Sequence, residues 1–206
     1  FTPRSGSPRE DIDWNNFTLR QRGRMLYMSS PVATSAINTN RTKVVGVGLT
    51  LKSSVDREVL GISPEAAKEW QRRTEAEFSL WAKNKANCDA TGMNNFYGMQ
   101  QLALVAWLQS GDVFPVFKRR NPTPVNPYSL RIHLVEADRV RTPAEYGGGT
   151  AVAHITDGKN PENGNRIFDG VEVDNDGMVV AYYVHNTYPW QTTTEPTKWT
   201  RVEAYG

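Results

Sequence analysis

The chain has 206 residues, of which 38% are hydrophobic and 22% charged, a composition typical of a soluble globular protein with one sizeable core or two small ones. Its 24 basic and 22 acidic residues leave a net charge of +2, which is less basic than is usual for a dedicated binder of duplex DNA. The lone cysteine, Cys88, excludes an intramolecular disulfide and a multi-cysteine zinc site, and the histidines follow no metal-ligand spacing. The uncharged stretch 91–111 holds too many amide side chains for a membrane span, so we expect no membrane association.

The first part of the chain carries helix signals. Residues 1–15 lack apolar periodicity and are expected to form a flexible arm, and residues 17–27 a first helix. Ser30 followed by Pro31 predicts the start of a second helix that stops at Gly46. Residues 47–52 alternate enough between apolar and polar side chains to predict a strand.

Two further helices are predicted more strongly. Ser63 and Pro64 begin a helix of about 20 residues. Its expected apolar face consists of Ala67, Trp70, Thr74, Phe78 and Trp81. The next helix begins after Asn94 or Asn95 and ends at Gly111. Because this helix has no charge, we expect it to be packed on most faces and to lie at the centre of the helical core.

From Asp112 onward the pattern changes to an alternation with period two. Strands are expected over residues 113–118, 129–135, 165–173 and 178–185. Residues 174–177, Asp-Asn-Asp-Gly, predict a hairpin between the last two. Residues 147–149 and 157–161 mark a long mobile connection. The order of elements predicts an α+β fold, with a mainly helical part over 16–111 and a mainly antiparallel β part over 112–206.

Charge is unevenly distributed along the β part. Residues 118–141 contain six basic and two acidic residues, whereas residues 157–177 contain six acidic and two basic residues. The commoner explanation of such segments is that they are solvated faces of a hairpin and a loop. The alternative is that neighbouring copies of the chain meet head to tail in a ring through opposite patches.

The sequence contains no convincing catalytic constellation. Cys88 adjoins Asp89 and has no histidine within 40 residues, which favours a small buried residue over a nucleophile. Four carboxylates leave a metal-dependent nuclease as an alternative, although a hairpin with a polar outer face explains them more simply: Asp169, Glu172, Asp174 and Asp176. The glycine clusters lack the lysine of a P-loop. We therefore expect no enzyme, no cofactor and no metal.

Binding of nucleic acid is a further alternative to a structural role, beside the metal-dependent nuclease. Phe114 and Phe117 precede the basic run Lys118, Arg119 and Arg120, and basic residues continue to Arg141. Aromatic and basic side chains that alternate on a strand can hold single-stranded nucleic acid, but the same run also fits a solvated strand end.

Residues 88–101, Cys-Asp-Ala-Thr-Gly-Met-Asn-Asn-Phe-Tyr-Gly-Met-Gln-Gln, resemble the portal proteins of lambda-type tailed bacteriophages. Other segments resemble that family in the same order over about residues 17–204: Ser-Pro-Val-Ala at 30–33, Val-Val-Gly-Val-Gly at 44–48, Gly-Asp-Val-Phe at 111–114, Glu-Ala-Asp-Arg at 136–139, and the hairpin over 167–184. Each segment alone is weak, and their common order makes the resemblance specific.

The resemblance implies a structural protein that forms a ring, usually a dodecamer, at one vertex of the viral capsid. DNA would pass through the ring during packaging and ejection, and the tail would attach to it. The implied partners are further copies of the chain, the terminase, the major capsid protein, head-tail connector proteins and double-stranded DNA in the channel. The implied location is the virion, with the host cytoplasm during assembly. Members of the family continue past the segment that matches residues 199–204, so we expect the wing-like portion here, without the clip, stem and crown.

The resemblance also implies structural, non-catalytic roles for a set of residues in this chain: Asp89, Gly92, Glu136, Asp138, Arg139, Gly170 and Gly177. The first two would shape the loop before the third long helix. The next three would fix a strand exit through local ion pairs or backbone hydrogen bonds, and the two glycines would serve the hairpin.

Overall fold

The structure is a computed structural model that describes residues 14–124, 126–147, 157–189, 191–192 and 194–205. The arm expected over residues 1–15 lies almost wholly outside these residues, as does much of the connection expected over 147–161. The chain divides into two compact units. Unit 1 comprises residues 1–33, 106–114 and 135–206, and unit 2 comprises residues 34–105 and 115–134.

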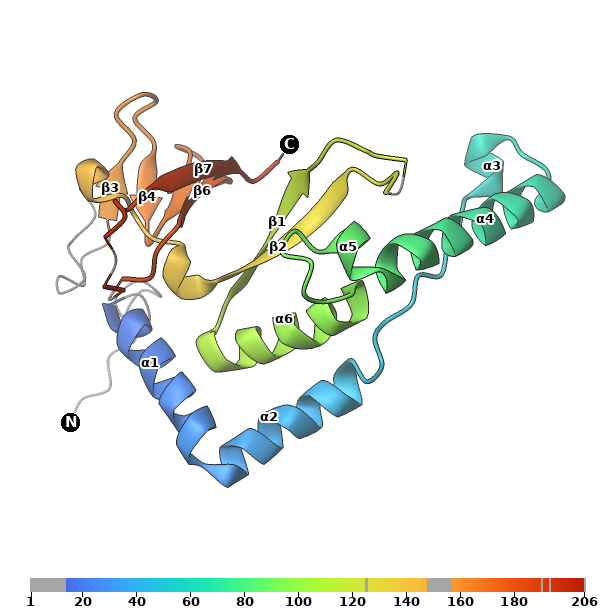
Figure 1. Cartoon of the computed structure of the whole chain (residues 1–206). Helices are drawn as coiled ribbons and strands as arrows, with labels where there is room; N and C mark the ends of the chain where they lie inside the picture. The colour runs from blue at the N-terminus through green and yellow to red at the C-terminus, as the bar shows by residue number, and fades with distance from the viewer. Residues whose placement is uncertain (1–13, 125, 148–156, 190, 193, 206) are drawn as a thin grey trace, which may run out of the picture. The chain divides into compact units, whose positions relative to one another are not determined.

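Helices come first in the chain and antiparallel strands follow, which confirms the α+β prediction (Figure 1). The helices are α1 Trp14–Ser29, α2 Pro31–Val44, α3 Arg57–Leu60, α4 Pro64–Lys83, α5 Lys85–Cys88 and α6 Phe96–Ser110. The strands are β1 Val113–Arg119, β2 Leu130–Glu136, β3 Asp157–Lys159, β4 Arg166–Phe168, β5 Val171–Val173, β6 Val179–His185 and β7 Trp199–Glu203. Two short 3-10 helices lie between β2 and β3, η2 Ala137–Arg139 and η3 Ala144–Tyr146.

The predicted helix starts are confirmed by their capping hydrogen bonds. The Ser63 hydroxyl accepts from the backbone N–H of Ala66 at 3.2 Å, and Pro64 occupies the first position of α4. Ser30 caps α2 in the same way through the N–H of Ala33 at 3.4 Å. A serine cap followed by proline satisfies a free N–H and presets the first helical φ angle, which is why the start of a helix can be located from sequence.

The strand expected over residues 47–52 is wrong, because residues 48–56 form neither helix nor strand. The backbone of Leu49 is instead satisfied by one side chain of α6. Its N–H donates to Oε1 of Gln100 at 2.6 Å, and its carbonyl accepts from Nε2 of Gln100 at 3.2 Å. A glutamine amide offers one acceptor and one donor and so replaces a neighbouring strand at this residue.

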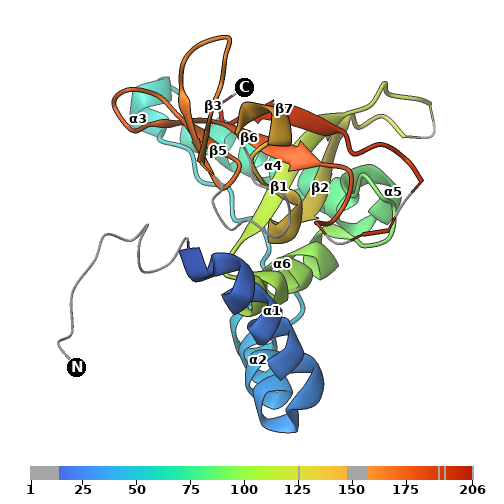
Figure 2. The same cartoon turned by 90° about the vertical axis from the view of Figure 1, so that its left-hand side faces the viewer.

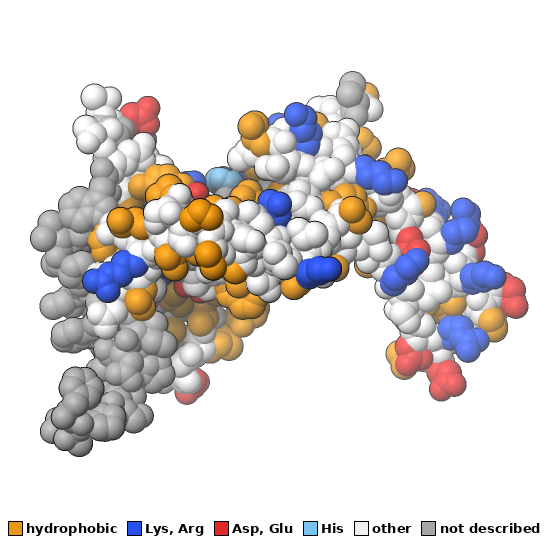
Figure 3. All heavy atoms as spheres, turned by 90° about the horizontal axis from the view of Figure 1, so that it is seen from below, with side chains coloured by type: hydrophobic (Ala, Val, Ile, Leu, Met, Phe, Trp, Pro, Cys, Tyr) orange, Lys and Arg blue, Asp and Glu red, His pale blue; other side chains and the backbone are white. Residues whose placement is uncertain are grey.

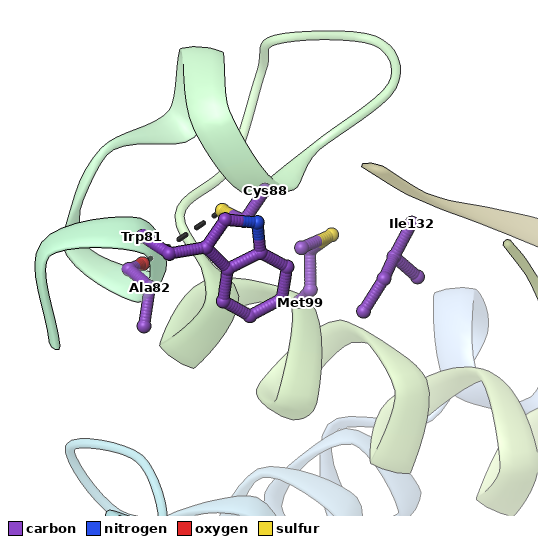
Figure 4. Close-up of a cluster of buried hydrophobic side chains, with 5 residues drawn as sticks. All are labelled: Trp81, Ala82, Cys88, Met99 and Ile132. Carbon is purple, nitrogen blue, oxygen red and sulfur yellow. Dashed lines mark hydrogen bonds between the residues drawn. The ribbon is translucent and has the colours of Figure 1, made fainter. Parts of the chain in front are cut away.

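The core of unit 2 is a cluster of buried side chains from α4, α5, α6 and β2: Trp81, Ala82, Cys88, Met99 and Ile132 (Figure 4). The indole N–H of Trp81 donates to the carbonyl of Leu130 at 3.1 Å, so its one polar group is satisfied inside the core. Phe96 packs edge-on against Phe78 with 5.5 Å between ring centroids. Aromatic pairs of this kind add to the free energy of burial, and the cluster joins three helices to a strand.

The expectation that α6 is packed on most faces is wrong. Of its residues only Met99 and Ser110 are buried, whereas Leu102 is 49% and Trp107 56% exposed. Trp70, expected on the apolar face of α4, is also 52% exposed. Hydrophobic side chains are visible at the surface in Figure 3. The absence of charge in a helix therefore does not show that the helix is buried.

Helix α1 of unit 1 has an inverted distribution of polar and apolar residues. It buries Arg20 and half-buries Arg24, whereas large apolar side chains on its other faces are exposed: Leu19, Met25, Leu26 and Met28. A helix normally turns its apolar stripe toward the core. Ion pairs of Arg20 and Arg24 with buried or half-buried carboxylates therefore contribute to holding α1 in unit 1.

Unit 1 contains a five-stranded antiparallel meander in the order β3-β4-β5-β6-β7 (Figures 1 and 2). The single strand expected over residues 165–173 is wrong, because this segment forms two strands, β4 and β5. They are joined by a tight turn in which Asp169 and Gly170 have φ angles of 45° and 84°. Positive φ at both central residues defines a type I′ hairpin turn, for which Asp-Gly is a favoured sequence. The signal was present in the sequence and was missed.

The hairpin predicted around residues 174–177 is confirmed, because β5 pairs with β6 across that turn. Oδ1 of Asp174 accepts from the backbone N–H groups of Asp176 and Met178, both at 2.9 Å. None of the helices in the described part of the chain is long and apolar enough to cross a membrane.

Gly170 and Gly177 provide a matched pair of variants. Both have φ angles near 85°, but a Cβ on Gly170 would lie 2.4 Å from the backbone nitrogen of Arg141, whereas a Cβ on Gly177 would meet nothing within 4 Å. We expect Gly177→Ala to cost about 1 kcal/mol from left-handed strain, and Gly170→Ala at least about 3 kcal/mol from strain and overlap. Urea unfolding measures both, and equal losses would contradict the close approach of Gly170 to Arg141.

Candidate functional site

The best-defined polar site in unit 1 lies where β2 leaves its sheet. Asp138 is buried there and receives a hydrogen bond from Nη1 of Arg24. Nη2 of the same arginine lies 3.3 Å from Oε2 of Glu136. Nη1 of Arg20 lies 3.9 Å from Oδ1 of Asp138. A buried carboxylate is stable in its charged form only when it is paired, and α1 supplies the cations.

Arg20 extends this cluster to two more segments. Its Nη2 lies 3.6 Å from Oδ2 of Asp112, which follows α6, and 3.5 Å from Oδ2 of Asp169 in the β4–β5 turn. Nδ2 of Asn16 also donates to Oδ2 of Asp169 at 3.2 Å. The two arginines of α1 thus face four carboxylates from three segments. The ion pairs of Glu136 and Asp138 therefore join residues that are distant in sequence, where local ion pairs or backbone hydrogen bonds were expected.

Arg139 and Arg141 bind backbone carbonyls inside unit 1. Nε of Arg139 donates to the carbonyl of His185 at 2.9 Å, and Nη1 of Arg141 donates to that of Thr187 at 2.8 Å. In unit 2, Arg131 is buried and donates to the carbonyl of Asn87. Of the six basic side chains in the patch expected over residues 118–141, these three are engaged internally, and Lys118, Arg119 and Arg120 are exposed.

In unit 2, Asp89 organises the loop between α5 and α6. Its buried carboxylate accepts from the backbone N–H of Thr91 at 2.8 Å, of Met93 at 3.1 Å and of Asn94 at 2.9 Å. Burial opposes ionisation of this group, but the hydrogen bonds outweigh burial and lower the pKa of Asp89. Gly92, inside the loop, has a φ of 69°, where glycine is favoured.

Cys88 lies in the core beside this loop, with its Sγ 3.7 Å from the carbonyl oxygen of Ala82 (Figure 4). Burial raises the pKa of the Cys88 thiol, and the charge of Asp89 raises it further. A nucleophilic cysteine requires the opposite shift, because the thiolate is the reactive form.

The four carboxylates of the nuclease alternative have separate environments. Glu172 is fully buried and accepts from a set of side chains: Asn160, Asn163, Asn165, Tyr183 and Arg201. Burial opposes its ionisation, yet these donors, led by Arg201, hold the pKa of Glu172 well below its usual range.

The other three carboxylates do not join Glu172. Asp169 faces Arg20, Asp174 closes its own turn, and Asp176 is exposed. Among the described residues, no group of three or more His, Cys, Asp or Glu side chains is placed to hold a metal ion.

His185 is a buried group that the sequence did not single out. Its Nε2 lies 3.0 Å from the carbonyl oxygen of Arg141. Burial, with a further contribution from the charge of Arg141, lowers the pKa of His185 to about 4. The ring is therefore neutral at physiological pH, and its Nε2 contacts a backbone carbonyl in the segment that follows η2.

We expect Asp89→Asn to lower the free energy of unfolding by about 2 kcal/mol at neutral pH, because the amide cannot replace charge-assisted bonds to three N–H groups. The folded-state pKa of Asp89 is lowered, so its stabilising contribution is present above the unfolded value of about 3.9 and is lost as the pH falls through the folded value. Denaturant titrations over a pH series should show that the difference in free energy of unfolding between the native chain and the variant becomes smaller below about pH 4. Thr91→Ser, which keeps the hydroxyl that also bonds Asp89, is the control.

A double-mutant cycle tests the cluster at the β2 exit. Arg24→Met and Asp138→Asn are each expected to cost about 3 kcal/mol, with a coupling energy of about 1–3 kcal/mol, because Asp138 is buried. The exposed pair Arg73 and Glu77, at 3.0 Å on α4, should show a coupling below about 0.5 kcal/mol in the same chemical unfolding assay. Equal coupling in the two cycles would contradict the structural importance of Asp138.

Comparison with known proteins places this arrangement in a family. The sequence matches the family described as "Phage portal protein, lambda family" over residues 1–206. It is also 28% identical over 180 residues to the probable portal protein of Halomonas phage phiHAP-1, an alignment that covers 87% of this chain and 31% of that protein. The chain thus spans about a third of the length of the curated relative that it matches. The match over its whole length shows that the chain belongs to the lambda family of phage portal proteins, a family of structural proteins.

Proposed function

We propose that the chain acts as a structural subunit, without catalytic activity, in the portal ring at the unique vertex of a phage capsid. In this role it contributes to the passage for DNA packaging and ejection and to the attachment point of the tail. The observation that carries the proposal is the family match over residues 1–206. The internal engagement of the polar side chains, with Asp89, Asp138 and Glu172 each held by several donors or cations, supports a structural role.

The proposed partners follow from that role. They are further copies of the chain, in a ring that we take to be a dodecamer in the full-length protein, together with the terminase, the major capsid protein and head-tail connector proteins. Double-stranded DNA would pass through the channel of that ring. The subunit would be located in the virion, after assembly in the host cytoplasm.

Two surface properties support assembly around DNA. Large apolar side chains are exposed on α1, among them Leu26 and Met28, and their cover by a neighbouring copy would be favourable, since exposed apolar side chains often lie in interaction sites. The net charge of +2 limits tight contacts with phosphates, which would slow DNA in a channel. We also propose the helical part over residues 16–111 and the β part over 112–206 as the two portions of a wing-like region.

Electron microscopy of the concentrated chain, together with sedimentation velocity, tests the proposal. Closed rings with a single dominant symmetry are expected. A monodisperse monomer at every concentration would contradict the proposal. Incubation with DNA and Mg²⁺ or Mn²⁺ is expected to leave the DNA intact, and cleavage that is lost in Asp174→Asn would instead support the nuclease alternative.

A further inference from the structure

The hairpin formed by β1 and β2 carries a strongly positive segment. Residues 113–135 contain four basic residues and no acidic residue. Of these, Arg131 is directed inward, whereas Lys118, Arg119 and Arg120 are exposed and form no ion pair with the described residues. Phe117 beside them is 69% exposed. We call residues 117–120 the basic tip.

The loop that follows the basic tip is held in place within unit 2. Backbone hydrogen bonds join Thr123 and Asn126 in both directions, at 2.8 and 3.0 Å. Nδ2 of Asn126 donates to the carbonyl of Ala86 in α5 at 2.8 Å. Prolines at 122, 124 and 127 restrict the backbone further. Because Thr123 and Asn126 are already held by these hydrogen bonds, docking would cost little further conformational entropy at these two residues.

A negative surface lies at one corner of the sheet in unit 1. It is formed by the β5–β6 turn, with Asp174 and Asp176, and by Glu203 at the end of β7. The register Ala181↔Glu203 and the hydrogen bond from the Ala204 N–H to the Val180 carbonyl, at 2.9 Å, place the end of β7 beside the start of β6. We call these three carboxylates the acidic corner.

Few cations accompany the acidic corner. Residues 167–197 contain five acidic residues and no lysine or arginine. Arg201, on β7, lies 3.5 Å from Glu203 but is bound more closely to Glu172, at 2.8 Å. Lys159 and Arg166 belong to β3 and β4, on the far side of β5 from β6 and β7. The corner also exposes apolar surface, since Met178 is 52% and Tyr205 68% exposed.

We propose that the basic tip of one copy of the chain binds the acidic corner of the next copy. The basic tip carries three exposed cations, the acidic corner carries the exposed carboxylates of Asp176 and Glu203 and the half-buried one of Asp174, and exposed apolar side chains accompany both sets. Opposite charges steer the encounter and fix its register, while apolar side chains at the centre of a contact supply most of the affinity. The contact joins two different patches of the same chain, so it is head to tail, and such a contact closes into a ring when the rotation permits.

A second copy explains both surfaces better than nucleic acid does. DNA would suit the basic tip, but it would be repelled by the acidic corner and would leave Met178 and Tyr205 exposed. This proposal rests on the proposed function, because it names the surfaces through which neighbouring subunits of the ring would contact each other.

Charge reversal on either side tests the contact in the full 206-residue chain. The tip variant is Arg119→Glu with Arg120→Glu, and the corner variant is Asp176→Lys with Glu203→Lys. Asp174 is kept because its side chain closes the turn. Sedimentation velocity should show association at least tenfold weaker in each variant and restored in the chain that carries all four changes. A control with the same charge change as the tip variant, Lys43→Glu with Lys68→Glu, replaces exposed lysines elsewhere and should assemble normally.

Disulfide trapping gives a second measurement that does not require strong association. The lone natural cysteine, Cys88, is buried, so introduced cysteines dominate oxidation. A chain with both Arg119→Cys and Asp176→Cys should form a ladder of linked dimers, trimers and larger species. An equimolar mixture of the two single variants should stop at dimers.

The possible results distinguish a failure of the proposed contact from a failure of the proposed ring. Assembly of the native chain with loss in both reversal variants, rescue on combination and a disulfide ladder would support the contact. Normal assembly of both variants, or no ladder from an assembling chain, would overturn the contact and leave the ring standing. A native chain that neither assembles nor cross-links would overturn both. If the tip variant lost only its retention on duplex DNA, the tip would be a nucleic-acid surface, and the proposal would fail.

Discussion

The five-stranded sheet of unit 1 depends on one buried charge, the carboxylate of Glu172. A fully buried carboxylate is strongly destabilising unless its oxygens are satisfied, and here the donors come from the β3–β4 loop, from Tyr183 on β6 and from Arg201 on β7. The sheet can therefore form only with all of these segments in register. Burial, together with the hydrogen bond to Glu172, raises the pKa of the Tyr183 hydroxyl, and the hydrogen bond to Glu172 raises that of Arg201, so each member of the network stays in the protonation state that its partners require.

Local chemistry made much of the fold predictable. The caps at Ser30 and Ser63, the change from helical to strand periodicity near Asp112, and the turn at residues 174–177 all depend on neighbours within a few residues. The failures have equally local causes. Asp169–Gly170 was a hairpin signal inside a segment interpreted as one strand, and residues 47–52 had the alternation of a strand but no strand partner.

The sites were less predictable because their partners are distant in sequence. The sequence drew attention to Asp138, but its cations, Arg20 and Arg24, lie more than 110 residues earlier on a helix that gave no other sign of function. Two arginines at a spacing of four residues share a helix face, which was the available signal. The basic segment over residues 118–141 was predicted to be a surface patch from its composition alone. Composition does not show which side chains point inward, and Arg131, Arg139 and Arg141 donate to internal backbone carbonyls.

The outward apolar side chains of α1 and α6 give the chain a distinctive response to temperature and solutes. The free energy gained by covering Leu26 or Trp107 comes from release of apolar surface from water, which weakens on cooling and strengthens in sulfate. Contacts between exposed charges, in contrast, weaken as ionic strength rises. The apolar contribution to any assembly that covered these side chains would therefore weaken on cooling and strengthen in sulfate, whereas the contribution of exposed charges would weaken with added salt.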